Sequence, residues 1–490
     1  MLVDSFKGGL FFHAANTHTS SSPAQNNLDG PQCQLMAKLQ CGSRVRLHVS
    51  LTLALTALTF CLPSPSQGQD SQPAAHFLSF LGSGSHKKTD PPAAPPLRST
   101  QQPAFTVPVE QLGFSAPGQF YLGTRISLVS LDFLDENRLL FTFRVPGLMH
   151  RDPKAGDGSD ERRIRAVVLR LPQGTVEAEA VWSLHDRARY LYMLDNGQFL
   201  LRDRDGLQLG DASLQLKPFL HFPGPVLWVE TDPSHRYLVT GSSEPAINKP
   251  QPGDVPSPAS ASATVTGDEK DVSDKPDMVL RIIRREDAKV MLVSRVRSAV
   301  HLPINSDGYL EALRSKGMAW LLNLNHFDGG STVLGSVDSL CSPLMNFVSP
   351  QVFMVTGCTS NGDPKLVAMS SDGRRLWETP PSGPLVWPLL VLGPDGSRLA
   401  RESLVTDHGV NAFAPLGIED IKGQAVEVFD AASGKVAMRA QASPVFDAGG
   451  NVAISPNGKR VAMVMAGAIQ IFDLPPPPPL PEATVNNAGR

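Results

Sequence analysis

The chain has 490 residues, with 44 Lys and Arg against 47 Asp and Glu and a formal net charge of −3. This near balance excludes the strongly basic surface of a nucleic-acid-binding protein and also a strongly acidic, solvating composition. With 41% hydrophobic and 19% charged residues, the chain is long and apolar enough to form a large core. The 43 prolines gather partly in linker-like stretches outside the segments that resemble strands.

The first 68 residues carry an export signal preceded by an unexpected extension. Residues 1–35 are polar and lack periodicity, although a secretory signal normally begins a chain. We therefore expect Met36 to be the true start and residues 1–35 to be disordered or an annotation artefact. Residues 36–68 combine basic residues, a 16-residue, mostly apolar run and the small residues Ser66 and Gly68. This pattern predicts a signal peptide that is cut between Gly68 and Gln69.

Two other interpretations of the apolar run are weaker. A membrane-spanning helix needs about 20 apolar residues, whereas this run is shorter and ends at Pro63. Lipidation at Cys61 would require a small residue where the bulky Phe60 stands. We therefore expect an exported protein, periplasmic or extracellular, without a stable membrane span after cleavage.

Cysteine usage agrees with export, because three of the five cysteines lie in or before the signal. Only Cys341 and Cys358 remain in the mature chain, an even number in an oxidising compartment. A turn at Ser349-Pro350 would place both at the open end of one hairpin, within the separation that a disulfide tolerates. We predict a Cys341–Cys358 disulfide that stabilises the fold; the alternative is a pair of buried free thiols.

Three segments have the composition of linkers rather than of a core. Residues 69–103 are rich in Pro, Ser and Ala, residues 244–277 are rich in Pro, Ser, Ala, Asp and Lys, and residues 475–490 begin with a polyproline run. Such segments cannot bury enough apolar surface to fold. We expect a disordered linker, a disordered insertion that is better explained as an inert loop excursion than as a partner-binding arm, and a disordered tail.

One phrase recurs seven times between residues 104 and 474: an apolar run, a turn of the Ser/Asp-Pro/Asn-Gly type, and a second apolar run. Asn-Gly and Asp-Gly supply the positive φ angles that tight hairpin turns require. The copies lie at 129–143, 191–201, 227–241, 302–313, 344–357, 389–402 and 451–465. Several are followed by a second hairpin, at 166–182, 278–296, 366–380 and 425–442. Two hairpins make the four-stranded sheet of one β-propeller blade.

The length supports a single all-β propeller of seven blades rather than a pair of β-sandwiches, with six or eight blades as the neighbouring possibilities. Without the apparent insertions 147–163, 244–277 and 405–423, 301 residues remain, or 43 for each of seven repeats. Propeller repeats are typically about 40–50 residues long. The last repeat lacks an outer strand, and residues 105–114 form an additional strand-like segment. We expect that segment to complete the last blade and close the ring.

The repeat phrases carry a family resemblance. SPNGKRVAMVM and GPDGSRLA resemble YVTN- and WD-type propeller repeats, and LVAMSSDGRRLWE and VEVFDAASGKV resemble those of quinoprotein-type propellers. The resemblance covers roughly residues 104–474 and implies blade geometry. It does not imply a function, because enzymes, adhesins and scaffolds share these phrases.

The sequence contains no recognisable catalytic motif. It has no HExxH, CxxC, G-x-S-x-G, Walker loop or strand-linked GxGxxG. The acidic run at 152–161 lacks the ligand spacing of an EF-hand and is interpreted as a solvated insertion. Four histidines near expected strand ends could gather in the channel, although lone histidines there are more often structural: His221, His235, His301 and His326.

We therefore predict a monomeric, exported propeller that acts as a binding or scaffold module of the cell envelope. Its partner would be an envelope protein, peptide or glycan, with no cofactor, metal or nucleic acid, and no catalytic residue can be named. The alternative is a propeller-class enzyme, a lactonase-like hydrolase or a quinoprotein-like oxidoreductase, with its site in the central channel. Three or more convergent His, Asp or Glu residues at the channel mouth would favour the enzyme.

Overall fold

The structure is a computed structural model that describes part of the chain. The described ranges are 101–116, 129–145, 150–151, 160–185, 188–244, 277–296, 301–379, 385–406, 418–443, 445–446 and 449–478. The extension 1–35, the signal 36–68 with its junction at Gly68 and Gln69, and most of the linker lie outside these ranges. So do residues 245–276 of the insertion and the tail from residue 479.

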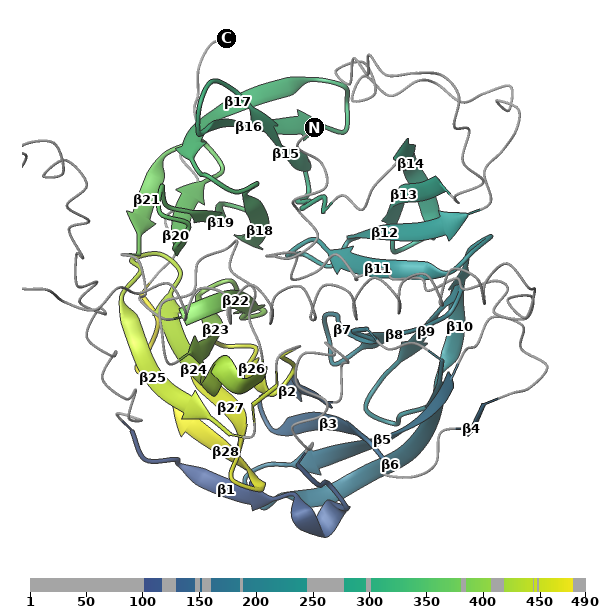
Figure 1. Ribbon diagram of the computed structural model, residues 1–490. Coiled ribbons are helices and arrows are strands. Elements are labelled where there is room, and N and C mark those ends of the chain that lie inside the picture. Colours follow the sequence, from purple (N-terminus) through teal and green to yellow (C-terminus); the bar gives the residue numbers. More distant parts are fainter. Residues whose placement is uncertain are drawn as a thin grey trace, which may run out of the picture. The chain divides into compact units, whose positions relative to one another are not determined.

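The described residues form seven antiparallel sheets arranged around a centre as a seven-bladed β-propeller (Figure 1). Blade 1 contains β2 (Val129–Asp135), β3 (Arg138–Arg144), β5 (Asp160–Arg170) and β6 (Thr175–Leu184), and the short β4 (His150–Arg151) also pairs with β5. Blade 2 contains β7 (Leu191–Met193), β8 (Phe199–Asp203), β9 (Gly206–Gly210) and β10 (Lys217–His221). Blade 3 contains β11 (Val226–Thr231), β12 (Tyr237–Glu244), β13 (Asp277–Arg284) and β14 (Lys289–Val296). The predicted fold class and blade number are confirmed.

The remaining blades follow in the same order along the chain. Blade 4 contains β15 (Gly308–Arg314), β16 (Ala319–His326) and β17 (Ser331–Asp338). Blade 5 contains β18 (Leu344–Ser349), β19 (Val352–Cys358), β20 (Pro364–Ser370) and β21 (Arg375–Glu378). Blade 6 contains β22 (Leu385–Leu392), β23 (Arg398–Thr406), β24 (Ile421–Asp430) and β25 (Val436–Ala442), and blade 7 contains β26 (Val452–Ile454), β27 (Arg460–Met465) and β28 (Ala468–Asp473). Two 3₁₀-helices, Glu110–Leu112 and Ile418–Asp420, complete the regular structure that is described.

The hairpin turns have the chemistry that the repeat phrase predicts. Between β7 and β8, Asn196 and Gly197 have φ angles of 56° and 69°, and such paired positive angles match the right-handed twist of the strands. A Cβ atom at Gly197 would stand 3.0 Å from the carbonyl oxygen of Leu134 in blade 1. Glycine therefore serves both the turn and the close approach of two blades at this position.

The ring closes through a strand from the start of the propeller. The strand β1 (Phe105–Pro108) pairs antiparallel with β28, and Val107 lies opposite Ile469. Val107, Val109 and Phe114 are buried in the core that blade 7 shares with blade 1. The predicted closure is confirmed, although the strand covers only the first part of residues 105–114 and a 3₁₀-helix follows it.

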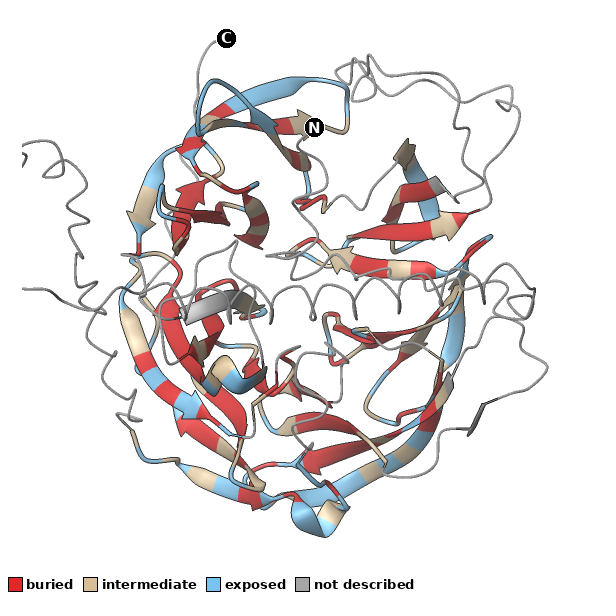
Figure 2. Cartoon of the chain, in the orientation of Figure 1, coloured by how far each residue is buried: buried red, intermediate tan, exposed pale blue. Residues whose placement is uncertain are grey.

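The hydrophobic cores lie between neighbouring blades, and burial falls toward the outer strands (Figure 2). Each cluster joins side chains of adjacent sheets. At the junction of blades 5 and 6, the Trp377 ring stacks on Phe429 with centroids 6.1 Å apart, and its Nε1 donates to the Ala431 carbonyl at 2.8 Å. Aromatic side chains thus seal this junction while their polar atoms stay hydrogen-bonded.

Two details of the repeat assignment need correction. The expected insertions are shorter than predicted, because strand pairing continues into their ends: β5 begins at Asp160, and Glu244 of β12 pairs with Asp277 of β13. In the fourth repeat, the expected first strand is reduced to one bridge between Ile304 and Tyr309. Pro303 lacks an N–H donor, which explains why a longer ladder does not form there.

Candidate functional site

Blade 1 contributes two polar side chains near the centre of the ring. In β2 the apolar residues Val129, Leu131 and Phe133 enter the core shared with blade 7. The alternating residues Ser130 and Asp132 therefore lie on the other face of the strand, toward blade 2. Ser130 Oγ donates to Asp132 Oδ2 at 2.5 Å. Burial raises the pKa of Asp132, while the Ser130 hydrogen bond and the charge of Arg189 partly oppose this effect.

Blade 2 contributes an exposed guanidinium in a fixed setting. Arg189 lies two residues before β7, and its Nε donates to the Leu191 carbonyl at 3.1 Å. Its guanidinium carbon stands 5.1 Å from the centroid of the Tyr192 ring, and the Tyr192 hydroxyl donates to the Arg189 carbonyl at 3.0 Å. No described carboxylate lies within ion-pair distance of Arg189, so its charge remains available to a ligand.

Beside Arg189, a buried tyrosine ties blade 2 to blade 1. The Tyr190 hydroxyl and Thr142 Oγ1 are hydrogen-bonded at 2.7 Å across the two blades. Burial raises the pKa of Tyr190 to about 12, so the phenol stays neutral at physiological pH. This contact fixes the backbone from which Arg189 projects.

Blade 6 contributes a buried carboxyl group, Glu402 on β23, which is only 2% exposed. Its Oε2 accepts a hydrogen bond from Gln424 Nε2 at 2.7 Å, and no described residue bonds to its Oε1. Burial raises the pKa of Glu402 to about 8, against the opposing charge of Arg189 and the Gln424 hydrogen bond. Glu402 is therefore mostly protonated at neutral pH.

The backbone fixes the orientation of the Gln424 amide. The Phe446 backbone N–H donates to Gln424 Oε1 at 3.2 Å, so this atom must be the carbonyl oxygen. The side chain of Asn451, which precedes β26 in blade 7, bonds reciprocally to the same amide. Gln424 Nε2 consequently faces Glu402 as a donor.

The field of Arg189 reaches carboxyl groups of two other blades. The charge of Arg189 in blade 2 acts on Asp132 in blade 1 and on Glu402 in blade 6. Blades 2 and 6 are not neighbours, so only the channel side allows one guanidinium to approach both. We call Ser130, Asp132, Arg189, Glu402, Gln424 and Asn451 the channel cluster.

A second polar link joins blades 3, 4 and 5. His301 Nδ1 lies 3.1 Å from Glu230 Oε2, and His301 Nε2 lies 2.5 Å from the Met345 carbonyl oxygen. A carbonyl only accepts hydrogen bonds, so Nε2 carries a proton. Burial raises the pKa of Glu230, and the charge of His301 opposes this effect. All three groups lie in the wall of the ring, and we interpret the link as structural.

A shallow recess lies where blade 7 meets blade 1. Residues of the β2–β3 and β26–β27 turns and of β28 line it, including Glu136, Asn457 and Arg460. The Asn457 backbone N–H donates to Glu136 Oε1 at 2.7 Å, and Arg460 Nη1 donates to the Glu136 carbonyl at 3.2 Å. Because these groups satisfy one another, the recess is better explained as a latch between two blades than as a binding site.

The four histidines suggested as a possible cluster do not come together in the structure. His221 is exposed at the end of β10, His235 lies in the β11–β12 turn, and His326 at the end of β16 bonds to Thr332. His301 is engaged in the wall, as described above. The described residues contain no group of three or more His, Cys, Asp or Glu that could hold a metal ion.

The predicted disulfide is present in the structure. Cys341 and Cys358 are bonded, with Cα atoms 5.5 Å apart. Cys341 lies in the connection from blade 4 to blade 5, and Cys358 ends β19, at the open end of the β18–β19 hairpin. Ser339 Oγ donates to the Cys341 carbonyl at 2.6 Å and accepts from the Cys358 backbone N–H at 3.0 Å.

No protein-family model matches the sequence, and no curated protein is significantly similar to it. Solved structures with a similar arrangement of strands include an acylaminoacyl peptidase from Pyrococcus horikoshii, at 12% identity and a TM-score of 0.42. The match covers 74% of this chain and 53% of the peptidase, so the chain spans about half the length of that protein.

Two further structures are similar at the same level. The β-propeller domain of the Trilobed protease from Pyrococcus furiosus is 12% identical with a TM-score of 0.38, covering 71% of this chain and 94% of that one. TolB from Acinetobacter baumannii is 13% identical with a TM-score of 0.34, covering 68% and 76%. Likenesses at this level concern the propeller fold and carry no information about function.

Proposed function

We propose that the chain is an exported propeller that binds a ligand at the channel cluster and performs no catalysis of its own. One observation carries this proposal: the exposed guanidinium of Arg189 is held by its own backbone and by Tyr192, and no described carboxylate lies within ion-pair distance of it. A cation fixed in this way is prepared for recognition, because little further ordering is needed when a ligand binds.

The polar groups around Arg189 favour binding over chemistry. Asp132 is held by Ser130, and Glu402 by an amide whose orientation the backbone fixes. The Ser130 hydroxyl contacts a carboxyl group, but no described histidine accompanies this pair as a serine nucleophile would require. The preferred partner is an envelope protein, peptide or glycan.

Export rests on the apolar segment within residues 36–68 and on the disulfide. Disulfides form and persist mainly in oxidising compartments, and Cys341–Cys358 is formed here. Among the described residues, no helix is long and apolar enough to cross a membrane. Fusing residues 36–75 to alkaline phosphatase tests the localisation. We expect an active fusion outside the cytoplasm, whereas an inactive cytoplasmic fusion would contradict export.

Site-specific photo-crosslinking tests binding at the channel. Ala188, half-buried beside Arg189, is replaced by p-benzoylphenylalanine in the producing cell, and Val176 on the outer strand of blade 1, which is 46% exposed, serves as the control. We expect one adduct of defined mass from position 188 only, and its loss when Arg189→Met is added. Identical adducts from both positions, or none from position 188, would refute a channel ligand.

A further inference from the structure

Building on the proposed function, we infer that the channel ligand presents a carboxylate to Arg189, and that ionisation of Glu402 weakens binding at this site. Arg189 is the group that touches the ligand. The Oε1 atom of Glu402 is buried and has no described hydrogen-bond partner. Glu402 therefore cannot touch the ligand and acts on it only through Arg189, as a positioning residue.

The geometry of Arg189 favours a carboxylate. Its Nε is engaged by the Leu191 carbonyl, which leaves both Nη groups for a ligand, and no described residue accepts from them. Two parallel N–H donors match the two oxygens of a carboxylate. Asp132 lies within the electrostatic reach of the same guanidinium, and a second negative charge close by disfavours a doubly charged phosphate.

The hydrogen bonds of Glu402 place its proton. Because Gln424 Nε2 donates to Oε2, the Oε1 atom carries the hydroxyl hydrogen of the neutral acid. Loss of that proton creates a buried negative charge whose single hydrogen bond, from Gln424, does not neutralise it. Arg189 is the exposed cation whose field already reaches Glu402. An ionised Glu402 therefore competes with the ligand for the same guanidinium.

The groups that face Glu402 leave Arg189 as its main charged partner. On its own strand, Arg401 is paired with Glu427 of β24, on the opposite face from Glu402. The strand β24 presents the neutral Gln424, and Leu389 of β22 and Gly449 also contact the site. Of the described titratable groups, Asp132 and Arg189 remain. Protonation of Asp132 at low pH would remove a second negative charge near Arg189 and would also strengthen ligand binding.

Binding of a minimal ligand tests both parts of the inference. N-acetylglycylglycine and its C-terminal amide are titrated at millimolar concentrations into the full-length protein, at about pH 6 and about pH 9, on either side of the Glu402 pKa. Isothermal titration and ligand-observed NMR report the affinity. We expect the acid alone to bind, with a roughly tenfold loss at the higher pH through one added charge.

Three variants separate the roles of the residues. Arg189→Met should abolish binding of the acid at both pH values, whereas Arg374→Met, an exposed arginine of blade 5, should leave binding unchanged. Glu402→Gln should retain binding and remove its pH dependence. Circular dichroism shows that each variant is folded.

Each other outcome overturns a named part of the inference. Equal binding of the acid and the amide rejects the carboxylate, while the crosslink at position 188 still supports a channel ligand. Tighter binding of inorganic phosphate than of the acid also rejects the carboxylate. An unchanged pH dependence in Glu402→Gln rejects the switch. No binding of the acid under any condition overturns the inference, and absence of the crosslink as well overturns the proposed function.

Discussion

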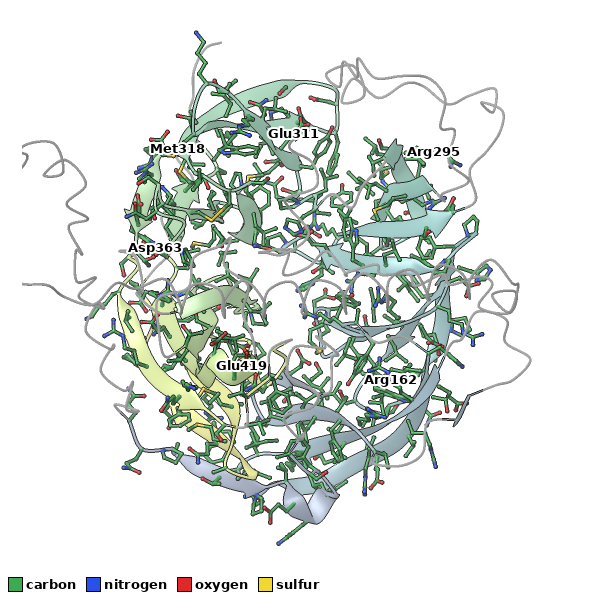
Figure 3. The ribbon with its side chains drawn as sticks, in the orientation of Figure 1. Arg162, Arg295, Glu311, Met318, Asp363 and Glu419 are labelled. Carbon is green, nitrogen blue, oxygen red and sulfur yellow. A yellow bond between two sulfur atoms is a disulfide. The ribbon has the colours of Figure 1, made fainter. Side chains whose placement is uncertain are left out.

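Blades 7 and 4 are built from the same repeat phrase and differ in how completely they are covered. Blade 7 has all four strands, the outermost supplied by β1, and its apolar side chains lie in shared cores. In blade 4 the innermost strand is a single bridge. Four of its large apolar side chains are exposed: Leu313, Met318, Leu321 and Val333. Met318 lies at the β15–β16 turn, toward the outside of the ring (Figure 3).

Turn chemistry and face packing are therefore specified separately in the two blades. Both repeats carry a Gly turn, Ser455-Pro-Asn-Gly in blade 7 and Asn305-Ser-Asp-Gly in blade 4, and both form a hairpin-like connection. Of the two, only blade 7 has a paired first strand, β26, and its side chains enter a core on each face. In blade 4, Pro303 weakens the first strand, and the outer half of one face remains open.

Blade 4 has a compensating anchor at its exit. Trp320 Nε1 donates to the Ser339 carbonyl at 2.9 Å, and Ser339 also bonds both residues of the disulfide. The Cys341–Cys358 bond thus ties the end of blade 4 to the hairpin of blade 5. The disulfide adds a covalent bond to the apolar cluster that blades 4 and 5 share.

The most severe test of the comparison removes the strand that completes blade 7. Deleting residues 101–114 exposes the edge of β28 and removes Val107, Val109 and Phe114 from the core. At about 1.5–3 kcal/mol for each large apolar side chain, the loss approaches the whole stability of a typical domain. We expect no cooperative transition in thermal denaturation followed by circular dichroism. A chain that ends at residue 478 is the control, and a cooperative melt of the 101–114 deletion would show that β1 is dispensable.

Removing the disulfide tests the anchor of blade 4. The double variant Cys341→Ser, Cys358→Ser opens a loop with a sequence separation of 17 residues. The chain-entropy model assigns about 3 kcal/mol to a loop of this size. Urea unfolding should show this loss, and the reduced wild-type protein should unfold like the variant. Equal stability of oxidised protein and variant would mean that the packing of blade 4 suffices without the bond.

Glu402 makes the free energy of unfolding depend on pH. Between about pH 4.5 and 8 the folded chain holds a proton on Glu402 that the unfolded chain has released. Stability from this group therefore decreases as pH rises, by roughly 1 kcal/mol per pH unit, and levels off above the folded pKa. Glu402→Gln should flatten this decline in denaturation curves, whereas Glu286→Gln, at an exposed position, should not. A parallel decline in wild type and Glu402→Gln would contradict the raised pKa.

The mildest test replaces one valine of blade 7 and one valine of blade 4 by threonine, in two separate variants. Val464 of β27 is fully buried and Val333 of β17 is 64% exposed. A hydroxyl group buried at position 464 should cost roughly 1–3 kcal/mol, whereas Val333→Thr should stay within about 0.5 kcal/mol. Thermal and urea unfolding of the two variants measure the contrast directly. Similar losses at both positions would show that the face of blade 4 is covered in solution.

The sequence allows prediction of the blades because their signals are local. Turn residues such as Asn196-Gly197 repeat at a nearly constant spacing, and residues 105–114 stand out as a strand without a partner. The channel cluster has no such signal. Asp132, Arg189 and Glu402 are single polar residues in unrelated phrases, and they meet only when the ring has closed. Glu402 stands between Arg401 and Ser403 in β23, so its sequence context does not distinguish it from the other polar residues of the strand. The histidines failed as a guide because strand ends face the outside as often as the channel.

The pairing of β1 with β28 also sets the order in which the protein can mature. Roughly 360 residues separate Val107 from its partner Ile469. At ribosomal rates of about 5–20 residues per second, the first strand waits roughly 20–70 s for the last one. During that interval the edge of β1 and the apolar side chains beside it have no partner. They can then aggregate or be bound by chaperones. Earlier blades can form as they emerge, but the ring is completed only by the final hairpin. A premature stop a few residues before Ile469 would therefore leave β1 without its partner strand. It would disturb blade 1 as well as blade 7, because the two blades share a core.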